Sequence, residues 1–197
     1  MIWGVPIATG VGVVLTHRWW GMRRHPSWMF AAWIGLAVIV AGVGASAVLG
    51  ALWPLWADIE LGVLGILGVV DATDRIIPHR LVVAIVLLGL GVHLWAHSIT
   101  LGLFLGVLAF LAVGLGLVWV TRDGFGLGDV KWMAGFALVV GWDWNLVAVV
   151  AGLWLTGAWV FGRRLLTHQD APTRQVPLGP FLAFGGWIAL IGYALYK

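Results

Sequence analysis

Long apolar runs separated by short polar segments dominate the chain. A helix that crosses a lipid bilayer needs about 20 consecutive, mostly apolar residues. Runs that approach this length predict eight membrane-spanning helices, over residues 2–16, 28–48, 53–70, 80–96, 99–120, 129–142, 145–162 and 177–196. The first and sixth runs are short, and a short run can be tilted or sheltered by its neighbours. We therefore expect an all-α polytopic membrane bundle with six to eight transmembrane segments.

The composition supports a membrane protein. Hydrophobic residues make up 62% of the chain, charged residues 10%, and the mean hydropathy is +1.03. A water-soluble domain of this size cannot bury so large an apolar share, because most of its surface must contact water. The length allows one compact bundle, so we expect a single integral-membrane domain over residues 1–197. The chain has no cysteine, which excludes disulfides, thiol catalysis and cysteine-bound zinc.

The basic residues predict the orientation of the bundle. Lys and Arg concentrate in the cytoplasmic loops of membrane proteins. Ten of the 11 basic residues fall in or beside the odd-numbered loops, at Arg18, Arg23, Arg24, Arg75, Arg80, Arg122, Lys131, Arg163, Arg164 and Arg174. The even-numbered loops are expected to carry Asp58, Glu60 and Asp143. The odd loops are therefore expected in the cytoplasm and both ends of the chain outside (N-out/C-out), and the net charge of +3 reflects orientation rather than nucleic-acid binding.

Two of the eight acidic residues stand where an apolar run meets a polar loop. Asp71 follows the third run and precedes Ile77-Pro78. Because proline fixes its own backbone and disfavours helix in the residue before it, the chain must break near this pair. Asp129 follows Gly126-Leu127-Gly128 and opens the sixth run. An ionised side chain in hydrocarbon costs at least about 2.5–3.5 kcal/mol, so carboxylates at this boundary are functional candidates by default.

Each carboxylate also has a plain structural interpretation. Asp71 can be a solvated acid at a helix end that pairs with Arg75, although acids are unfavourable near a helix C-terminus. Asp129 can cap the helix that follows it, and for Asp129 taken alone capping is the better explanation. Considered together, the two residues are the pair of carboxyl groups that aspartyl peptide hydrolysis requires, because one ionised and one protonated carboxyl can act as base and acid.

Three ordered motifs resemble those of the type IV prepilin peptidases, which are membrane aspartyl proteases of the Gly-x-Gly-Asp class. That family typically shows an Asp at the end of a span, seven residues before the proline of an Ile-Pro pair, as Asp71 and Pro78 are. It then shows Gly-x-Gly-Asp-x-Lys, which residues 126–131 match, and a late Pro-x-Gly-Pro-Phe-Leu-Ala motif, which residues 177–183 match. The motifs cover about residues 60–190.

The resemblance implies a multi-pass aspartic endopeptidase of the bacterial inner membrane, with its active site facing the cytoplasm. It implies Asp71 and Asp129 as the catalytic dyad, without deciding which one starts protonated, and no metal or cofactor. The implied supporting or substrate-binding residues are Gly126, Gly128, Lys131, Pro78, Asp74, Gly179 and Pro180. The implied partner is a prepilin or pseudopilin with a short basic leader, a glycine before the cut and an apolar helix after it. Lipids are expected as neighbours and nucleic acid is not.

Several supporting residues keep a second interpretation. Asp74 and Asp123 either contact the basic leader or are ordinary solvated loop acids. Lys131 either adjusts the charge of the dyad or anchors the start of its helix at lipid head groups. The pair Gly179-Pro180 is expected to kink the last helix, and this kink either shapes the substrate entrance or serves packing alone.

The chain departs from the larger members of the family. Those members carry an extended cytoplasmic loop with paired cysteines and a region linked to N-methylation, whereas the corresponding loop here is about residues 17–27. The resemblance therefore implies the peptidase and leaves the methyltransferase unsupported. Competing interpretations are another intramembrane aspartyl protease, of the presenilin type, and a proton-coupled transporter that uses Asp71 and Asp129 as relay groups. The natural substrate, the secretion system served and the oligomeric state stay open.

Overall fold

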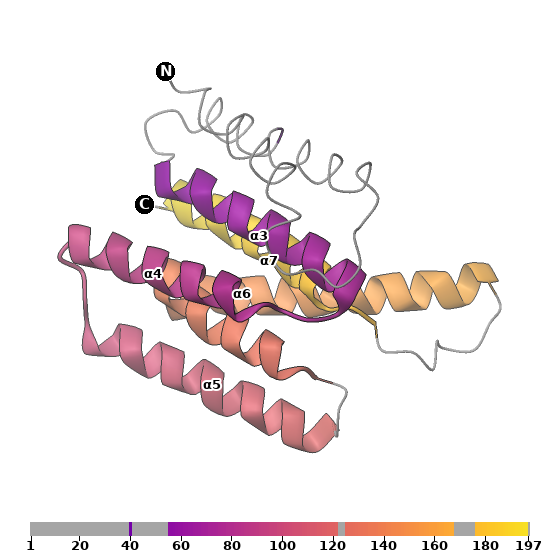
Figure 1. Cartoon of the computed structure of the whole chain (residues 1–197). Helices are drawn as coiled ribbons and strands as arrows, with labels where there is room; N and C mark the ends of the chain where they lie inside the picture. The colour runs from indigo at the N-terminus through magenta and orange to yellow at the C-terminus, as the bar shows by residue number, and fades with distance from the viewer. Residues whose placement is uncertain (1–39, 41–54, 122–124, 168–175, 197) are drawn as a thin grey trace.

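The computed structural model describes residues 40, 55–121, 125–167 and 176–196, and this part of the chain is helical, with no strand. Its helices are, in chain order, α3 (Leu55–Asp74), α4 (His79–Trp95), α5 (Leu101–Thr121), α6 (Leu127–Thr167) and α7 (Gly179–Tyr196). They lie together as one bundle (Figure 1). The predicted segments 2–16 and 28–48 lie outside the described residues.

The predicted segments from residue 53 onward coincide with these helices, and the expectation of an all-α membrane bundle is confirmed. Within the described part, α5, α6 and α7 are long and apolar enough to cross a membrane, and α4 is a shorter apolar helix. The total of eight segments and the orientation stay predictions.

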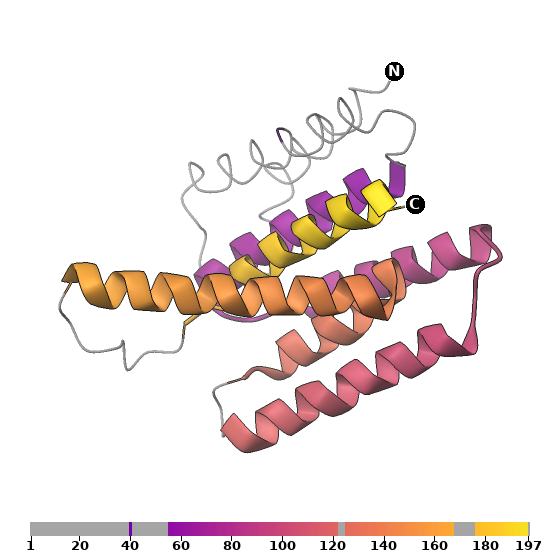
Figure 2. The same ribbon diagram turned by 180° about the vertical axis from the view of Figure 1, so that it is seen from behind.

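Helix α6 consists of two arms that meet at Gly141. This residue has φ 82° and ψ 172°, a backbone conformation that is essentially restricted to glycine. The second arm doubles back from Gly141, so the two arms form a V (Figures 1 and 2). Near the apex the buried Nδ2 of Asn145 donates a hydrogen bond to the Met133 carbonyl at 2.9 Å. The predicted segments 129–142 and 145–162 are these two arms.

The first arm of α6 is the centre of the bundle. Residues 132–140 are all buried, and the rings of Trp132 and Phe136 stack with their centroids 5.1 Å apart. Helices α4, α5 and α7 all pack against α6. At about 1.5 Å per residue the first arm is too short to cross a bilayer unaided. Neighbouring helices cover it instead, as a helix with apolar residues on every side requires.

Glycines let α7 lie close against α3, and the two helices run side by side (Figure 1). A Cβ atom on Gly186 would lie 2.8 Å from Cδ1 of Leu64, and one on Gly68 would lie 3.5 Å from Cα of Pro180. Small residues at such positions allow helices in a membrane to approach closely. This contact brings the end of α3 level with the beginning of α7.

Two acidic residues assigned to a polar loop by the sequence lie instead inside α3. Asp58 is 4% exposed and Glu60 is fully buried, and both lie within α3, so the expectation that they belong to an even-numbered loop was wrong. Helix α3 begins at Leu55, which places Asp58 in its first turn, where an acid interacts favourably with the helix dipole. Within the part of the chain that the structure describes, neither carboxyl oxygen of Glu60 has a hydrogen-bond partner.

Candidate active site

Asp71 lies near the end of α3, and its side chain is 6% exposed. Its Oδ2 accepts a hydrogen bond from the backbone N–H of Gly179, the first residue of α7, at 2.7 Å. The absence of a side chain at Gly179 permits this approach, because a Cβ there would lie 2.5 Å from Cβ of Asp71. The packing of α3 against α7 thus joins the first and third sequence motifs.

The Ile-Pro pair separates α3 from α4 as the sequence predicted. Arg75 directly follows α3 in the left-handed conformation, with φ 55°, and its N–H donates to the carbonyl of Asp71 at 2.9 Å. A left-handed residue of this kind is a common helix ending. Pro78 then caps the start of α4, and its carbonyl accepts hydrogen bonds from the N–H groups of Leu81 and Val82.

Asp129 lies in the first turn of α6 and is 9% exposed. Its Oδ2 accepts a hydrogen bond from the backbone N–H of Gly126 at 3.2 Å, while the carbonyl of Gly126 accepts one from Val130. This is the arrangement in which the third residue of a helix reaches back to the capping residue. Asp129 therefore helps to cap α6, but from inside its first turn and not as the residue that precedes the helix, which the sequence had predicted.

A close contact brings the two carboxylates together. A Cβ on Gly128 would lie only 2.9 Å from Cβ of the buried Ile77, so the start of α6 rests against the α3–α4 connection. Asp129 is close enough to Asp71 to interact with it electrostatically, and Asp71 interacts in the same way with Arg75. Two neighbouring buried carboxyls share a proton and titrate as a pair.

The remaining predicted residues surround this pair more loosely. Lys131 is exposed in the first arm of α6, and Asp74, the last residue of α3, is half-buried. Gly179 and Pro180 begin α7, so the expected kink inside a helix at these residues was wrong. Proline is tolerated in the first turn because its missing N–H would have no partner within the helix there. Asp123 lies outside the described residues.

Two contacts of the site were not anticipated by the sequence motifs. These are the N–H of Gly179 on Asp71 and the support that Ile77 gives to Gly128. The available signal was the glycine in each motif, because glycine at a helix start permits close approach of another chain segment. The glycines alone do not predict which segment of the chain lies against them.

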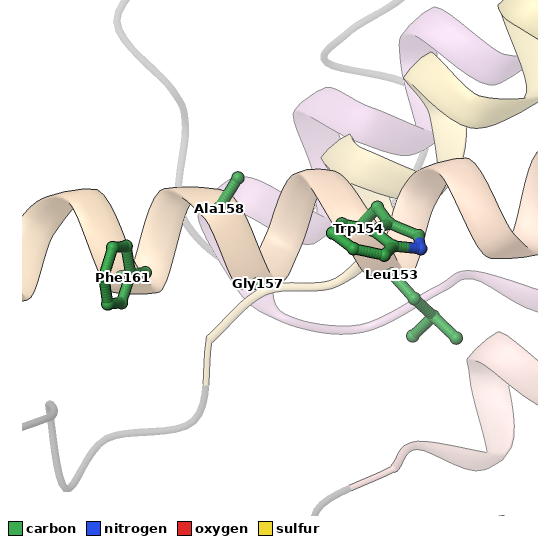
Figure 3. A pocket seen from close by; sticks show the side chains of 5 residues that line it. All are labelled: Leu153, Trp154, Gly157, Ala158 and Phe161. Atoms are coloured by element: carbon green, nitrogen blue, oxygen red, sulfur yellow. The ribbon is translucent and has the colours of Figure 1, made fainter.

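An apolar hollow of about 590 Å³ lies elsewhere, on the second arm of α6 (Figure 3). It is lined by Leu153, Trp154, Gly157, Ala158 and Phe161. Hydrolysis of a peptide bond needs an acid and a base, and this lining has neither. We therefore place the candidate site at the two carboxylates. Among the described residues no three His, Cys, Asp or Glu side chains gather as metal ligands.

The profile of the Type IV leader peptidase family matches residues 59–161, just over half of the chain. This chain belongs to that family. The matched residues include Asp71 and Asp129 but not Gly179. The resemblance to prepilin peptidases that the sequence motifs carry is therefore confirmed at the level of the family.

Curated relatives in this leader peptidase family are similar over most of the chain. A protein named prepilin leader peptidase/N-methyltransferase from Aeromonas salmonicida is 32% identical over 171 residues, covering 79% of this chain and 54% of its own length. Its namesake from Aeromonas hydrophila is 28% identical over 169 residues, covering 83% and 56%. The chain thus spans about half the length of the curated relatives it matches. No solved structure matches it significantly.

Proposed function

We propose that this chain is a membrane aspartic endopeptidase that removes the short leader of type IV prepilin-like or pseudopilin substrates. The observation that carries the proposal is the approach of two buried carboxylates, Asp71 and Asp129, from the ends of two different helices. Membership of the leader peptidase family supplies the reaction class. We extend only the peptidase part of the relatives' name to this chain, because the matching profile is that of a leader peptidase.

In the proposed mechanism the dyad activates a water molecule. The ionised carboxylate removes a proton from the water, and the water oxygen attacks the scissile carbonyl carbon. At the same time the protonated carboxyl gives its proton to the carbonyl oxygen. The resulting tetrahedral intermediate loses the leaving nitrogen, which takes the proton held by the first carboxylate. The second carboxyl recovers its proton as the carbonyl re-forms, so the dyad returns to its starting state.

The substrate that fits this site has an apolar helix beside a short extended segment. The exposed apolar side chains of α5 and α6 face lipid in a bacterial inner membrane, and the dyad lies at the cytoplasmic side. A glycine before the cut lets an extended backbone reach recessed carboxylates. Lys131 and Pro78 flank the dyad in this proposal, and Asp74 is placed to meet a basic leader.

The test is cleavage of a prepilin-like substrate by the purified full-length chain in liposomes. We expect one cut, after the leader glycine, and a loss of at least about 1,000-fold in kcat/KM in D71A and in D129A, as removal of a group acting in the chemical step produces. G116A is the control, because a Cβ on Gly116 meets nothing within 4 Å. Retained cleavage in both aspartate variants would refute the dyad.

The leader contact has a separate test. In D74K and D123K, alone and combined, we expect a higher KM for a substrate with a basic leader and an unchanged KM for one with a neutral leader, because like charges repel. Equal processing of both substrates by the double variant would show that these acids are ordinary loop residues.

A further inference from the structure

We propose that the backbone N–H of Gly179 positions the Asp71 carboxylate, so that Asp71 is the member of the dyad that activates water and Asp129 is the member that holds the shared proton. This inference rests on the proposed function, because it assigns roles within the same dyad. The juxtaposition that carries it is the amino end of α7 against the end of α3.

The hydrogen bonds of the first turn of α7 leave one donor for Asp71. The N–H groups of Phe181 and Leu182 both donate to the carbonyl of Leu178, and Pro180 has no N–H. The N–H of Gly179 is the remaining donor of this turn, and it donates to Oδ2 of Asp71 in a buried position. The start of a helix carries partial positive charge, which favours an ionised carboxylate there.

The two carboxylates differ in the bonds they receive. The bond from Gly179 to Asp71 is 2.7 Å long and buried, the length expected of an N–H bound to a charged carboxylate. The bond from Gly126 to Asp129 is 3.2 Å long, partly buried, and joins residues three apart in one turn. Asp71 therefore receives the stronger stabilisation of a negative charge.

The charges around the dyad favour the same assignment. Among the residues that the structure describes, Arg75, directly after α3, is the cation that interacts with Asp71, and Asp129 interacts with Asp71 from α6. Helix α7 contains no charged residue, His79 and Arg80 at the start of α4 are exposed, as is Lys131 in α6, and Asp74 at the end of α3 is half-buried. A proton shared by the pair is thus most stable on Asp129, because Asp71 has the shorter hydrogen bond and the interaction with Arg75.

Gly179 is suited to this positioning role by its lack of a side chain. A Cβ at this residue would lie 2.7 Å from Oδ2 of Asp71 and 2.8 Å from its Cγ, so alanine would displace the carboxylate. Gly186 offers a matched control in the same α3–α7 contact, because a Cβ there would lie 2.8 Å from Cδ1 of Leu64 and would meet no atom of the dyad.

The first experiment compares G179A with G186A in the liposome assay, with thermal unfolding measured for both. We expect G179A to lose at least about 100-fold in kcat/KM, the usual cost of misplacing a reacting group by about 1 Å. G186A should lose far less activity at an equal loss of thermal stability. Equal activities at equal stability would overturn the role of Gly179.

The second experiment compares D71N with D129N across pH. The amide of D129N still donates a hydrogen bond, so we expect a residual activity that rises with pH to a plateau, without the alkaline decline of the wild type. D71N has lost the base and should be inactive at every pH. Residual activity in D71N together with none in D129N would reverse the assignment.

A third measurement does not depend on cleavage and keeps the inference testable if the wild type cuts no prepilin-like substrate. Infrared spectra of D129N and of the double variant D71N/D129N report whether Asp71 is protonated, and the contribution of Glu60 cancels in the difference. We expect no protonated-carboxyl band in the difference spectrum near neutral pH. A band present in D129N and lost in the double variant would show that Asp71 is protonated even without the opposing charge of Asp129, and would overturn its assignment as the base.

Discussion

Gly128 shows how much of the site depends on an absent side chain. A Cβ on Gly128 would lie 2.9 Å from the Cβ of Ile77, and Asp129 follows Gly128 directly. We predict that G128A loses about 100-fold in kcat/KM, because a methyl group pushes the start of α6 away from the α3–α4 connection. The cleavage assay measures this loss. G116A in α5 is the control, because a Cβ on Gly116 meets nothing within 4 Å. Full activity in G128A would show that the connection yields to the added methyl.

Glu60 is a second residue at which a single side chain affects the property measured, here the free energy of unfolding. It is fully buried in α3, and neither carboxyl oxygen has a hydrogen-bond partner among the described residues. An unsatisfied buried polar group costs about 1–3 kcal/mol. We predict that E60L raises the free energy of unfolding by about this amount, measured by denaturation in detergent. E60Q, which keeps a buried polar group, should not. A loss of stability in E60L would mean that the carboxyl is needed where it lies.

Among the elements, α6 depends most on one backbone conformation. Alanine at Gly141 would have to adopt φ 82° and ψ 172°, a strain of about 1–3 kcal/mol. We predict that G141A is destabilised by this amount, measured in the same denaturation assay. G157A is the control from the second arm, where a Cβ meets nothing within 4 Å and alanine is the better helix former by about 0.5–1 kcal/mol. Equal stability of the two variants would contradict a rigid V.

The helices themselves follow from the sequence, because hydropathy and Ile77-Pro78 determine where apolar helices run and where α3 must stop. The depth of Asp58 and Glu60 does not follow, since it depends on which helices cover them. The bond between Asp71 and Gly179 was also not predictable, because it joins residues 108 positions apart. Motifs locate the candidate chemistry, whereas packing decides which backbone group meets each carboxylate.

At the scale of the whole molecule, the order of the helices brings the motifs to one end of the bundle. Helix α4 runs away from Pro78, α5 returns, and α6 begins at Leu127 beside the end of α3 (Figure 1). The second arm of α6 then runs back along α7, so that Gly179 also lies at this end. Both carboxylates and the amide of Gly179 therefore share one side of the proposed membrane.

This arrangement turns the predicted orientation into a labelling experiment. The chain has no cysteine, so a single introduced cysteine is the sole target of a thiol reagent. Ala96 follows α4 at the end opposite Asp71, and Arg164 lies in the last turn of α6; both are exposed. Because basic residues stay in the cytoplasm, we predict that a membrane-impermeant maleimide labels A96C in intact cells and labels R164C only after the membrane is opened. The reverse pattern would place the dyad on the outer side of the membrane and contradict cleavage at the cytoplasmic face.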